Sequence, residues 1–304
     1  MRGVRKIKRM IDIGFTVCKR AGIPFYWSKY SKKSYTIHQH LLIVVLSEYF
    51  GMSIERTLEM IREDRYIRSL LKLRSVPHKS TISRFKKRVK EGWFALLFRK
   101  INDMLGKGRG RCAVDSTGLR ISKRSFYYTK RIGKEIKIRE CLKLHVVMDI
   151  DTRIILSANV TRFRVNDSKM FIPLLENVEK IREVYADRGY DSKRNIEYVL
   201  GRGGAPYIAV RKNAVRGVRK RILKEMDKKE WKKKYGMRNR IESAFHAIKT
   251  RYGEYVFART FVTGKIQSLF KILAYNIHIF PLSFLILPFS CFSGNSTYPL
   301  THSV

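Results

Sequence analysis

The chain has 304 residues, 44% of them hydrophobic, and its 65 Lys and Arg against 25 Asp and Glu give a formal charge of +40. The apolar content is enough for a folded core and excludes wholesale disorder, while so much self-repulsion indicates a polyanionic partner, first of all nucleic acid. Four scattered cysteines without a CxxC pair support neither a zinc ribbon nor a disulfide framework, and are typical of an intracellular protein with reduced thiols.

The N-terminal third is basic and predicts several short helices. Residues 1–34 have no regular hydrophobic period, so we expect a partly irregular arm. The apolar stretch 36–50 predicts a helix, Ser53 can cap a second helix over 54–62, and residues 67–73 predict a third.

A basic helix over residues 81–89 follows a turn that contains Pro77. A short helix, a turn and a capped basic helix together favour a helix-turn-helix that contacts DNA, with Arg84 and Lys87 as its candidate DNA-binding side chains. A plain helical bundle with a solvated basic face is the alternative. These segments predict a small all-α domain with a basic arm over residues 1–105.

Beyond a Gly-containing boundary at 106–110, the pattern changes to strands. The expected strands are 111–121, 142–150, 153–163, 184–186 and 207–210, with helices over 169–181 and 191–200 and a last helix from Tyr235. Three strands followed by helix–strand–helix–strand–helix predict an α/β fold, a mixed ribonuclease-H-like sheet flanked by helices, over residues 111–280. The second and third strands would form a hairpin around Asp151.

Two segments stand apart from this pattern. A basic insert over residues 211–234 holds twelve Lys or Arg and three acids; it is either a phosphate-binding unit or a mobile solvated loop, and such a loop can order on DNA. Its Trp231 either stacks on a flipped base or anchors the insert. The apolar C-terminal segment predicts a helix ending near Phe280 and a tail over 281–304. Its prolines disfavour a membrane span. A membrane-tethered protein stays an alternative that rests only on this apolar tail.

One face of the last helix gathers unusual side chains. At about 100° per residue, Tyr235, Arg238, Glu242 and Lys249 fall within roughly a 60° arc. Arg238 and Lys249 could grip phosphate, and Tyr235 could stack on a base or bind a phosphate. The alternatives are an i,i+4 salt bridge between Arg238 and Glu242, and packing for Tyr235.

Two further acids, Asp115 and Asp187, each close an apolar, strand-like run. Together with Glu242 they make the set of three carboxylates that two divalent metal ions need for chemistry on phosphate. Three other acids could compete as metal ligands. Asp149 and Asp151 are interpreted as hairpin-turn residues and Asp167 as a helix cap, and Asp167 is the strongest competitor.

The spacing Tyr-x2-Arg-x3-Glu-x6-Lys, met from Tyr235 to Lys249, resembles the C-terminal signature of the DDE transposases of bacterial and archaeal insertion sequences. Residues 113–117 (AVDST) and 185–191 (YADRGYD) resemble the two aspartate blocks of that family, and the resemblance covers most of residues 36–280. It implies a ribonuclease-H-like catalytic domain in which Asp115, Asp187 and Glu242 hold two Mg²⁺ or Mn²⁺ ions.

The resemblance also implies an activity and partners. Water would cleave the transposon ends, and the freed 3′-hydroxyl would then attack target DNA. The expected partners are double-stranded DNA, as terminal inverted repeats and target, and a second copy of the chain in an active homodimer, without a membrane. The expected location is the prokaryotic cytoplasm, at the nucleoid. The alternatives are a ribonuclease-H-like metal-dependent nuclease and a non-catalytic DNA-binding protein whose acids are structural.

Overall fold

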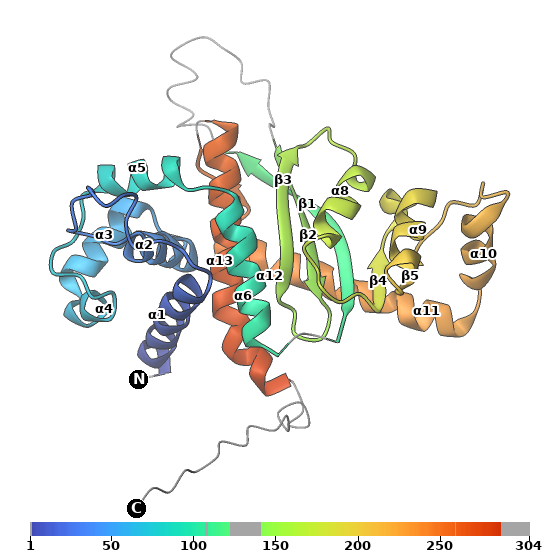
Figure 1. The fold of residues 1–304 in the computed structure, drawn as a ribbon, viewed down its shortest axis with the longest axis horizontal. Helices are drawn as coiled ribbons and strands as arrows, with labels where there is room; N and C mark the ends of the chain where they lie inside the picture. Colours follow the sequence, from blue (N-terminus) through green and yellow to red (C-terminus); the bar gives the residue numbers. More distant parts are fainter. Residues whose placement is uncertain (1, 107–108, 122–140, 259, 287–304) are drawn as a thin grey trace, which may run out of the picture.

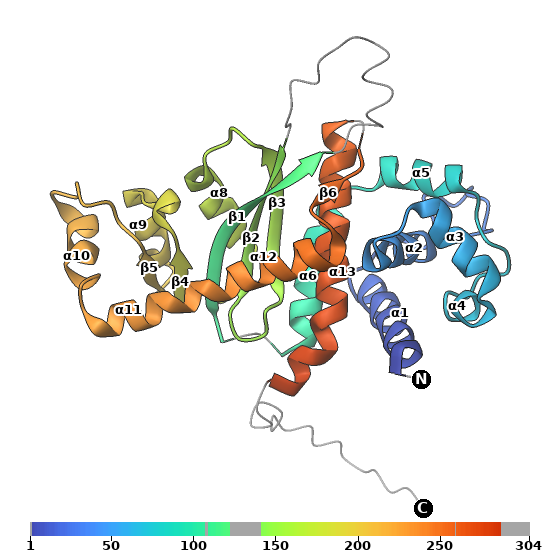
Figure 2. The same ribbon diagram turned by 180° about the vertical axis from the view of Figure 1, so that it is seen from behind.

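The computed structural model describes residues 2–106, 109–121, 141–258 and 260–286. A six-stranded mixed sheet carries helices on both faces, and a group of helices from the N-terminal third lies to one side of it (Figures 1 and 2). The predicted fold class is confirmed. Part of the predicted boundary, residues 107–108, and most of the predicted tail, residues 287–304, lie outside the described residues.

The sheet has the strand order β3-β2-β1-β4-β5, with the short β6 paired to the far end of β1. β2 runs antiparallel to both β1 and β3, whereas β4, β5 and β6 run parallel to β1. This is the order expected for a ribonuclease-H-like sheet. The bounds of the strands are β1 Arg111–Ile121, β2 Cys141–Asp149, β3 Ile155–Arg162, β4 Glu183–Ala186, β5 Ala205–Ile208 and β6 Tyr255–Val256.

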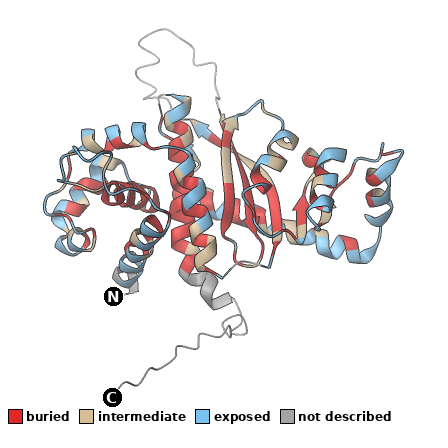
Figure 3. Cartoon of the chain, in the orientation of Figure 1, coloured by how far each residue is buried: buried red, intermediate tan, exposed pale blue. Residues whose placement is uncertain are grey.

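Different helices cover the two faces of the sheet. α8 (Asp167–Leu175) and α9 (Lys193–Gly201) lie in front of it in Figure 1, whereas α11 (Lys229–Tyr235) and α12 (Asn239–Tyr252) lie in front in the reverse view of Figure 2. The central strand β2 is almost wholly buried between these layers (Figure 3). α8 ends sooner than expected, at Leu175, and it contains Pro173.

Of the N-terminal helices, α1, α2, α5 and α6 pack against α13, and α6 also packs directly against β3 (Figure 1). Thr36 begins α2 with a capping box and Ser53 caps α3, the latter as predicted. The bounds are α1 Arg2–Arg20, α2 Ile37–Phe50, α3 Ile54–Glu63, α4 Arg65–Leu70, α5 Lys79–Arg88, α6 Gly92–Met104 and α13 Phe261–Ile286. α13 therefore runs beyond the predicted end at Phe280. Among the described residues, no helix has the length and hydropathy that crossing a membrane requires.

The arm expected over residues 1–34 is irregular in part, as predicted: its first half forms α1, and no helix or strand follows until α2. Met10 and Val17 are buried two turns apart on one side of this helix. Between them, Gly14 lies so close to α2 that an added Cβ would stand 2.2 Å from Leu42. Basic residues occupy the rest of the helix surface, and because they alternate with the apolar residues in the sequence, the buried apolar side of the helix is difficult to recognise there.

The mobile-loop interpretation of the basic insert is wrong over most of its length. Residues of the insert form α10 (Gly217–Glu225) and α11. The fully buried Asp191 carboxylate accepts from Arg219 Nε at 2.8 Å and so ties α10 to the sheet domain. Trp231 is buried and stacks on Tyr235 with ring centroids 4.8 Å apart, which is the anchoring role.

A buried ion pair joins the N-terminal helices to the sheet domain. Glu48 of α2 and Lys271 of α13 lie 3.0 Å apart with side chains only 6% and 4% exposed. Lys271 Nζ also donates to the carbonyl of Tyr252, the last residue of α12. Three helices therefore meet at one desolvated ammonium, and removing it leaves a buried carboxylate without its cation.

We expect Lys271→Met to lower the free energy of unfolding by about 3–5 kcal/mol, measured by urea titration, because it strands the Glu48 charge. The double variant Glu48→Leu/Lys271→Met should unfold close to the parent chain. The control is Lys228→Met, which breaks an exposed pair with Glu225 and should cost about 1 kcal/mol or less. Equal effects of the two single variants would contradict this role.

Candidate active site

Asp115 and Asp187 are brought together by the register of two parallel strands. Val114 of β1 lies opposite Ala186 of β4, the last pair of their ladder. The next residue on each chain is an aspartate, and neighbouring strands are about 4.8 Å apart. The two predicted carboxylates therefore lie side by side where β4 ends, on the face of the sheet that α12 covers.

A glycine shapes the turn that follows Asp187. Asp187 Oδ1 accepts from the backbone N–H of Gly189 at 2.8 Å and begins the short helix η1 (Arg188–Tyr190). A Cβ at Gly189 would lie 2.9 Å from that same oxygen. Any side chain at position 189 would have to displace this oxygen, so glycine lets the Asp187 carboxylate accept the hydrogen bond from its backbone N–H.

Arg238 connects the acid on β1 to the acid on α12. Its Nη1 donates to Asp115 Oδ2 at 2.9 Å, and its Nη2 forms an ion pair with Glu242 Oε1. Both carboxylates thus contact one guanidinium, whose side chain is 17% exposed. Burial lowers the pKa of Arg238, but the negative charges of Asp115, Glu242 and the nearby Asp187 raise it, and the net effect is a raised pKa. The predicted i,i+4 contact of Arg238 with Glu242 is therefore observed, with Asp115 as an additional partner.

Charge crowding perturbs Asp115. The pKa of Asp115 is raised to about 6. Burial is the largest cause, and the negative charges of Asp187 and Glu242 act in the same direction. The backbone N–H of Ser116 and the Arg238 guanidinium act in the opposite direction. A carboxylate buried next to two others is short of positive charge, and a cation bound between them would relieve the repulsion.

The donor chemistry of this set fits hard divalent cations, which prefer carboxylate oxygens. Within the described residues, however, no three His, Cys, Asp or Glu side chains are grouped closely enough to hold a metal ion. The Arg238 guanidinium instead supplies the positive charge between Asp115 and Glu242.

The remaining predicted site residues are spread along the chain. The helix predicted from Tyr235 is confirmed as α12 from Asn239 onward, whereas its first turn is a 3-10 turn, η2 (Gly236–Arg238), and Tyr235 ends α11. Lys249 lies on α12 two turns beyond Glu242 and is half-buried. On α5, beyond α13 from the sheet (Figure 1), Arg84 and Lys87 are exposed. Their contacts with DNA stay predictions.

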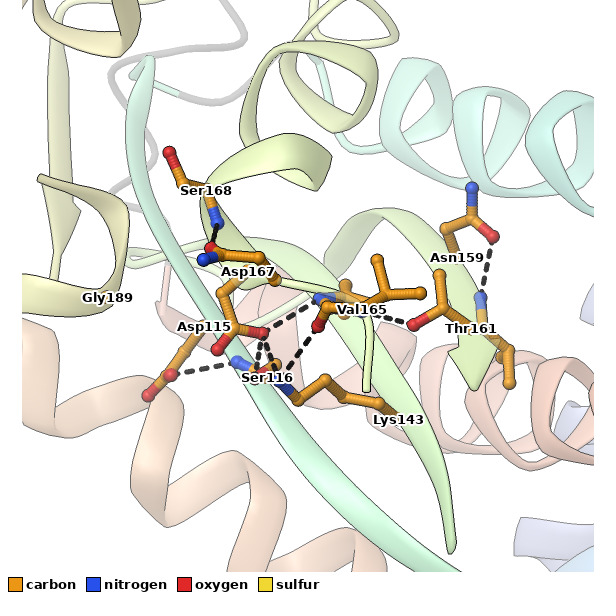
Figure 4. Close-up of polar contacts among 12 residues, drawn as sticks. Asp115, Ser116, Lys143, Asn159, Thr161, Val165, Asp167, Ser168 and Gly189 are labelled. Atoms are coloured by element: carbon orange, nitrogen blue, oxygen red, sulfur yellow. Dashed lines mark hydrogen bonds and ion pairs between the residues drawn. The ribbon is translucent and has the colours of Figure 1, made fainter. Parts of the chain in front are cut away.

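A polar cluster that sequence reasoning missed supports β1 next to Asp115 (Figure 4). Asp167 Oδ1 accepts from Ser116 Oγ at 2.8 Å and lies 3.0 Å from Lys143 Nζ. Successive strand side chains alternate between faces, so Ser116 points away from the face of Asp115. Asp167 therefore braces the strand from the α8 side.

The interpretation of Asp167 as a helix cap is wrong, because Asn166 caps α8 by accepting from Ser168 N at 2.9 Å. With two neighbouring Asx residues, the sequence alone does not distinguish which one is the cap. Asp149 and Asp151 occupy the hairpin turn as predicted: Asp149 Oδ1 accepts from the backbone N–H of Asp151, and Asp151 forms an ion pair with Arg111.

Comparisons with known proteins found matching family models and a similar solved structure. The family model described as "Transposase DDE domain" matches residues 106–277, and one described as "Transposase domain (DUF772)" matches residues 3–88. Among solved structures, the fold is similar to the piggyBac transposase, determined by cryo-EM as a synaptic complex with hairpin DNA. The TM-score is 0.51 at 10% sequence identity, over 91% of this chain and 74% of that chain.

The raised pKa of Asp115 predicts a stability effect in metal-free protein. The folded chain keeps this proton up to about pH 6, whereas an ordinary aspartate loses it near pH 3.9. The free energy of unfolding should therefore fall as pH rises from about 4 to about 6. Asp115→Asn cannot lose this proton, so above pH 6 it should be about 2–3 kcal/mol more stable than the parent. The amide oxygen can still accept from Arg238.

Thermal unfolding of the two metal-free proteins across this pH range is the measurement. We expect Asp115→Asn to melt higher than the parent well above pH 6 and the difference to vanish near the ordinary aspartate pKa. A parent protein that melts higher than the variant at neutral pH would show that Asp115 is stabilised as a carboxylate, contrary to the charge crowding described.

Proposed function

This chain belongs to the DDE transposase family, and we propose that it cleaves DNA at transposon ends and transfers the freed 3′-hydroxyl into target DNA, with Asp115, Asp187 and Glu242 as its catalytic carboxylates. The observation that carries these assignments is the convergence of two of the acids on one guanidinium, with the third adjacent by strand register. The two strands and the packed helix hold the oxygens on a rigid support.

Divalent metal ions are general in this family, and two Mg²⁺ or Mn²⁺ ions held by the three acids would activate the attacking oxygen and stabilise the leaving one. The residues of the chain do the rest. Asp115 and Asp187 present neighbouring oxygens at the end of β4, and Glu242 closes the site from α12. Arg238, once it leaves the acids, can hold the scissile phosphate through its planar fork of donors.

DNA is the proposed partner at several surfaces. The charge of +40 suits a polyanion, and the similar piggyBac transposase is described in complex with hairpin DNA. Tyr235, Arg238 and Lys249 would contact DNA near the acids, and Arg84 and Lys87 would contact it from α5. Two copies of the chain would each act on one end, as a homodimer. The proposed location is the cytoplasm of a prokaryote, at the nucleoid.

The direct test uses a labelled duplex from the DNA flanking the gene, where inverted repeats mark the element end. With Mg²⁺, the parent should cleave this duplex and join its 3′ end to a second DNA. Asp115→Asn, Asp187→Asn and Glu242→Gln should each reduce both steps by about 10³-fold or more, the scale seen when one member of a catalytic unit is removed.

A matched control is available for Glu242. Glu197 of α9 has a side chain that is also 52% exposed and also forms an i,i+4 ion pair, with Lys193. Glu197→Gln should keep parental rates. Cleavage without strand joining by the parent would indicate a nuclease, and parental rates in Asp115→Asn would end the proposed role of the acids.

A further inference from the structure

A row of polar side chains crosses β1, β2 and β3 on the face of the sheet that α8 covers. Register places Ser116 of β1 opposite His145 of β2. His145 is fully buried, and its Nε2 lies 2.8 Å from Thr161 Oγ1 on β3. Two residues further along the same face, the opposing pair is Val114 and Val147, both fully buried. The face therefore accepts apolar pairs, and the polar row is a departure from them.

Asp167, at the start of α8, gathers the donors of this row (Figure 4). Besides accepting from Ser116 Oγ, its Oδ1 lies 3.0 Å from Lys143 Nζ and 3.4 Å from His145 Nδ1. Burial lowers the pKa of His145 to about 4. The imidazole is therefore neutral near pH 7, and Lys143 supplies the positive charge that balances Asp167. One carboxylate oxygen thus ties α8 to both β1 and β2.

Stability alone does not account for this row. A buried polar or charged group gives up its water, and replacing a buried ionic network by well-packed apolar side chains of similar volume is often neutral or stabilising. What a satisfied network adds to apolar packing is direction, because each hydrogen bond or ion pair fixes how its two partners meet. The row therefore points to a geometry close to Ser116 that has to be held.

That geometry is the orientation of the Asp115 carboxylate, whose two oxygens have different partners. Oδ1 accepts from the backbone N–H of Ser116 at 2.8 Å, whereas Oδ2 accepts from Arg238 Nη1 on the opposite side of the sheet from α8. Ser116 thus bonds on both faces, through its hydroxyl to Asp167 and through its N–H to Asp115. A shift of the backbone at Ser116 would rotate the Asp115 carboxylate and move Oδ2.

We propose that Asp167 is a positioning residue for Asp115. It holds Ser116 from the α8 face, so that the Ser116 N–H keeps Asp115 Oδ1 and leaves Oδ2, which now contacts Arg238, for a metal ion. Asp167 itself does not bind the metal ions, although its residue type made it the strongest competing ligand in the sequence. This rests on the proposed function, since it takes Asp115 to be a metal ligand.

The test compares substitutions of equal shape in the whole chain. Ser116→Thr keeps the hydroxyl and Ser116→Val has the same shape without it, while Asp167→Asn removes the charge that Lys143 balances. Asp151→Asn is the control, because it removes an equal charge from another ion pair on β1, with Arg111. The Kd for Mn²⁺ is measured without DNA, from the electron paramagnetic resonance signal of free Mn²⁺. The Mg²⁺ dependence of element-end cleavage is the second readout.

Ser116→Val and Asp167→Asn should each weaken Mn²⁺ binding by about 10–100-fold, the range found for residues that orient metal ligands. The double variant should bind Mn²⁺ no more weakly than the weaker single variant, because both changes break one contact. Ser116→Thr and Asp151→Asn should keep the parental Kd. In cleavage, the Mg²⁺ concentration at half-maximal rate should rise in the two affected variants, while their Kd for the element-end duplex without metal stays parental.

Two results would overturn the inference. Parental metal dependence in Ser116→Val and Asp167→Asn, with only a lower melting temperature, would make the row purely structural. Loss of Mn²⁺ binding in Asp167→Asn alone, with Ser116→Val at the parental Kd, would make Asp167 a ligand. The proposed function is judged separately by Asp115→Asn: if that variant loses metal binding and cleavage while Ser116→Val keeps both, the catalytic acids stand and only the positioning role falls.

Discussion

The geometry of the site depends on like charges held together on an apolar sheet. Two aspartates follow directly from the register of β1 and β4, and the rigid ladder does not let them separate. Burial and mutual repulsion raise the pKa of Asp115 to about 6, and Arg238 compensates by contacting both Asp115 and Glu242. A site of this kind stores unfavourable electrostatic energy that a bound cation and phosphate can release.

The rest of the chain keeps this site in shape. The ammonium of Lys271 binds Glu48 and the last carbonyl of α12, so the helix that carries Glu242 is tied to α2 and α13. The fully buried Asp191 holds α10 through Arg219. Strand, helix and insert are thus connected by buried charges, each of which is expensive to leave without its partner.

Much of the fold was predictable from local signals. β1 has the predicted bounds, Ser53 caps α3, and the order of strands and helices identified the mixed sheet. The omissions and errors arose where tertiary contacts decide: the stripe of α1 is hidden by its basic residues, the apolar α6 was not predicted, and η2 interrupts the helix expected from Tyr235. The three acids were predictable as residue types after strands and on a helix, but the contacts of Arg238 with both Asp115 and Glu242 depend on how α12 packs against β1.

The central claim is that the acids which Arg238 now contacts are metal ligands. It is tested most directly by anomalous scattering from crystals of the protein with Mn²⁺ and a DNA end. The account predicts two Mn²⁺ ions about 3.5–4 Å apart, bound by Asp115, Asp187 and Glu242, with the Arg238 guanidinium turned to the phosphate. Mn²⁺ bound elsewhere in crystals that cleave their DNA, with Arg238 still between Asp115 and Glu242, would contradict it.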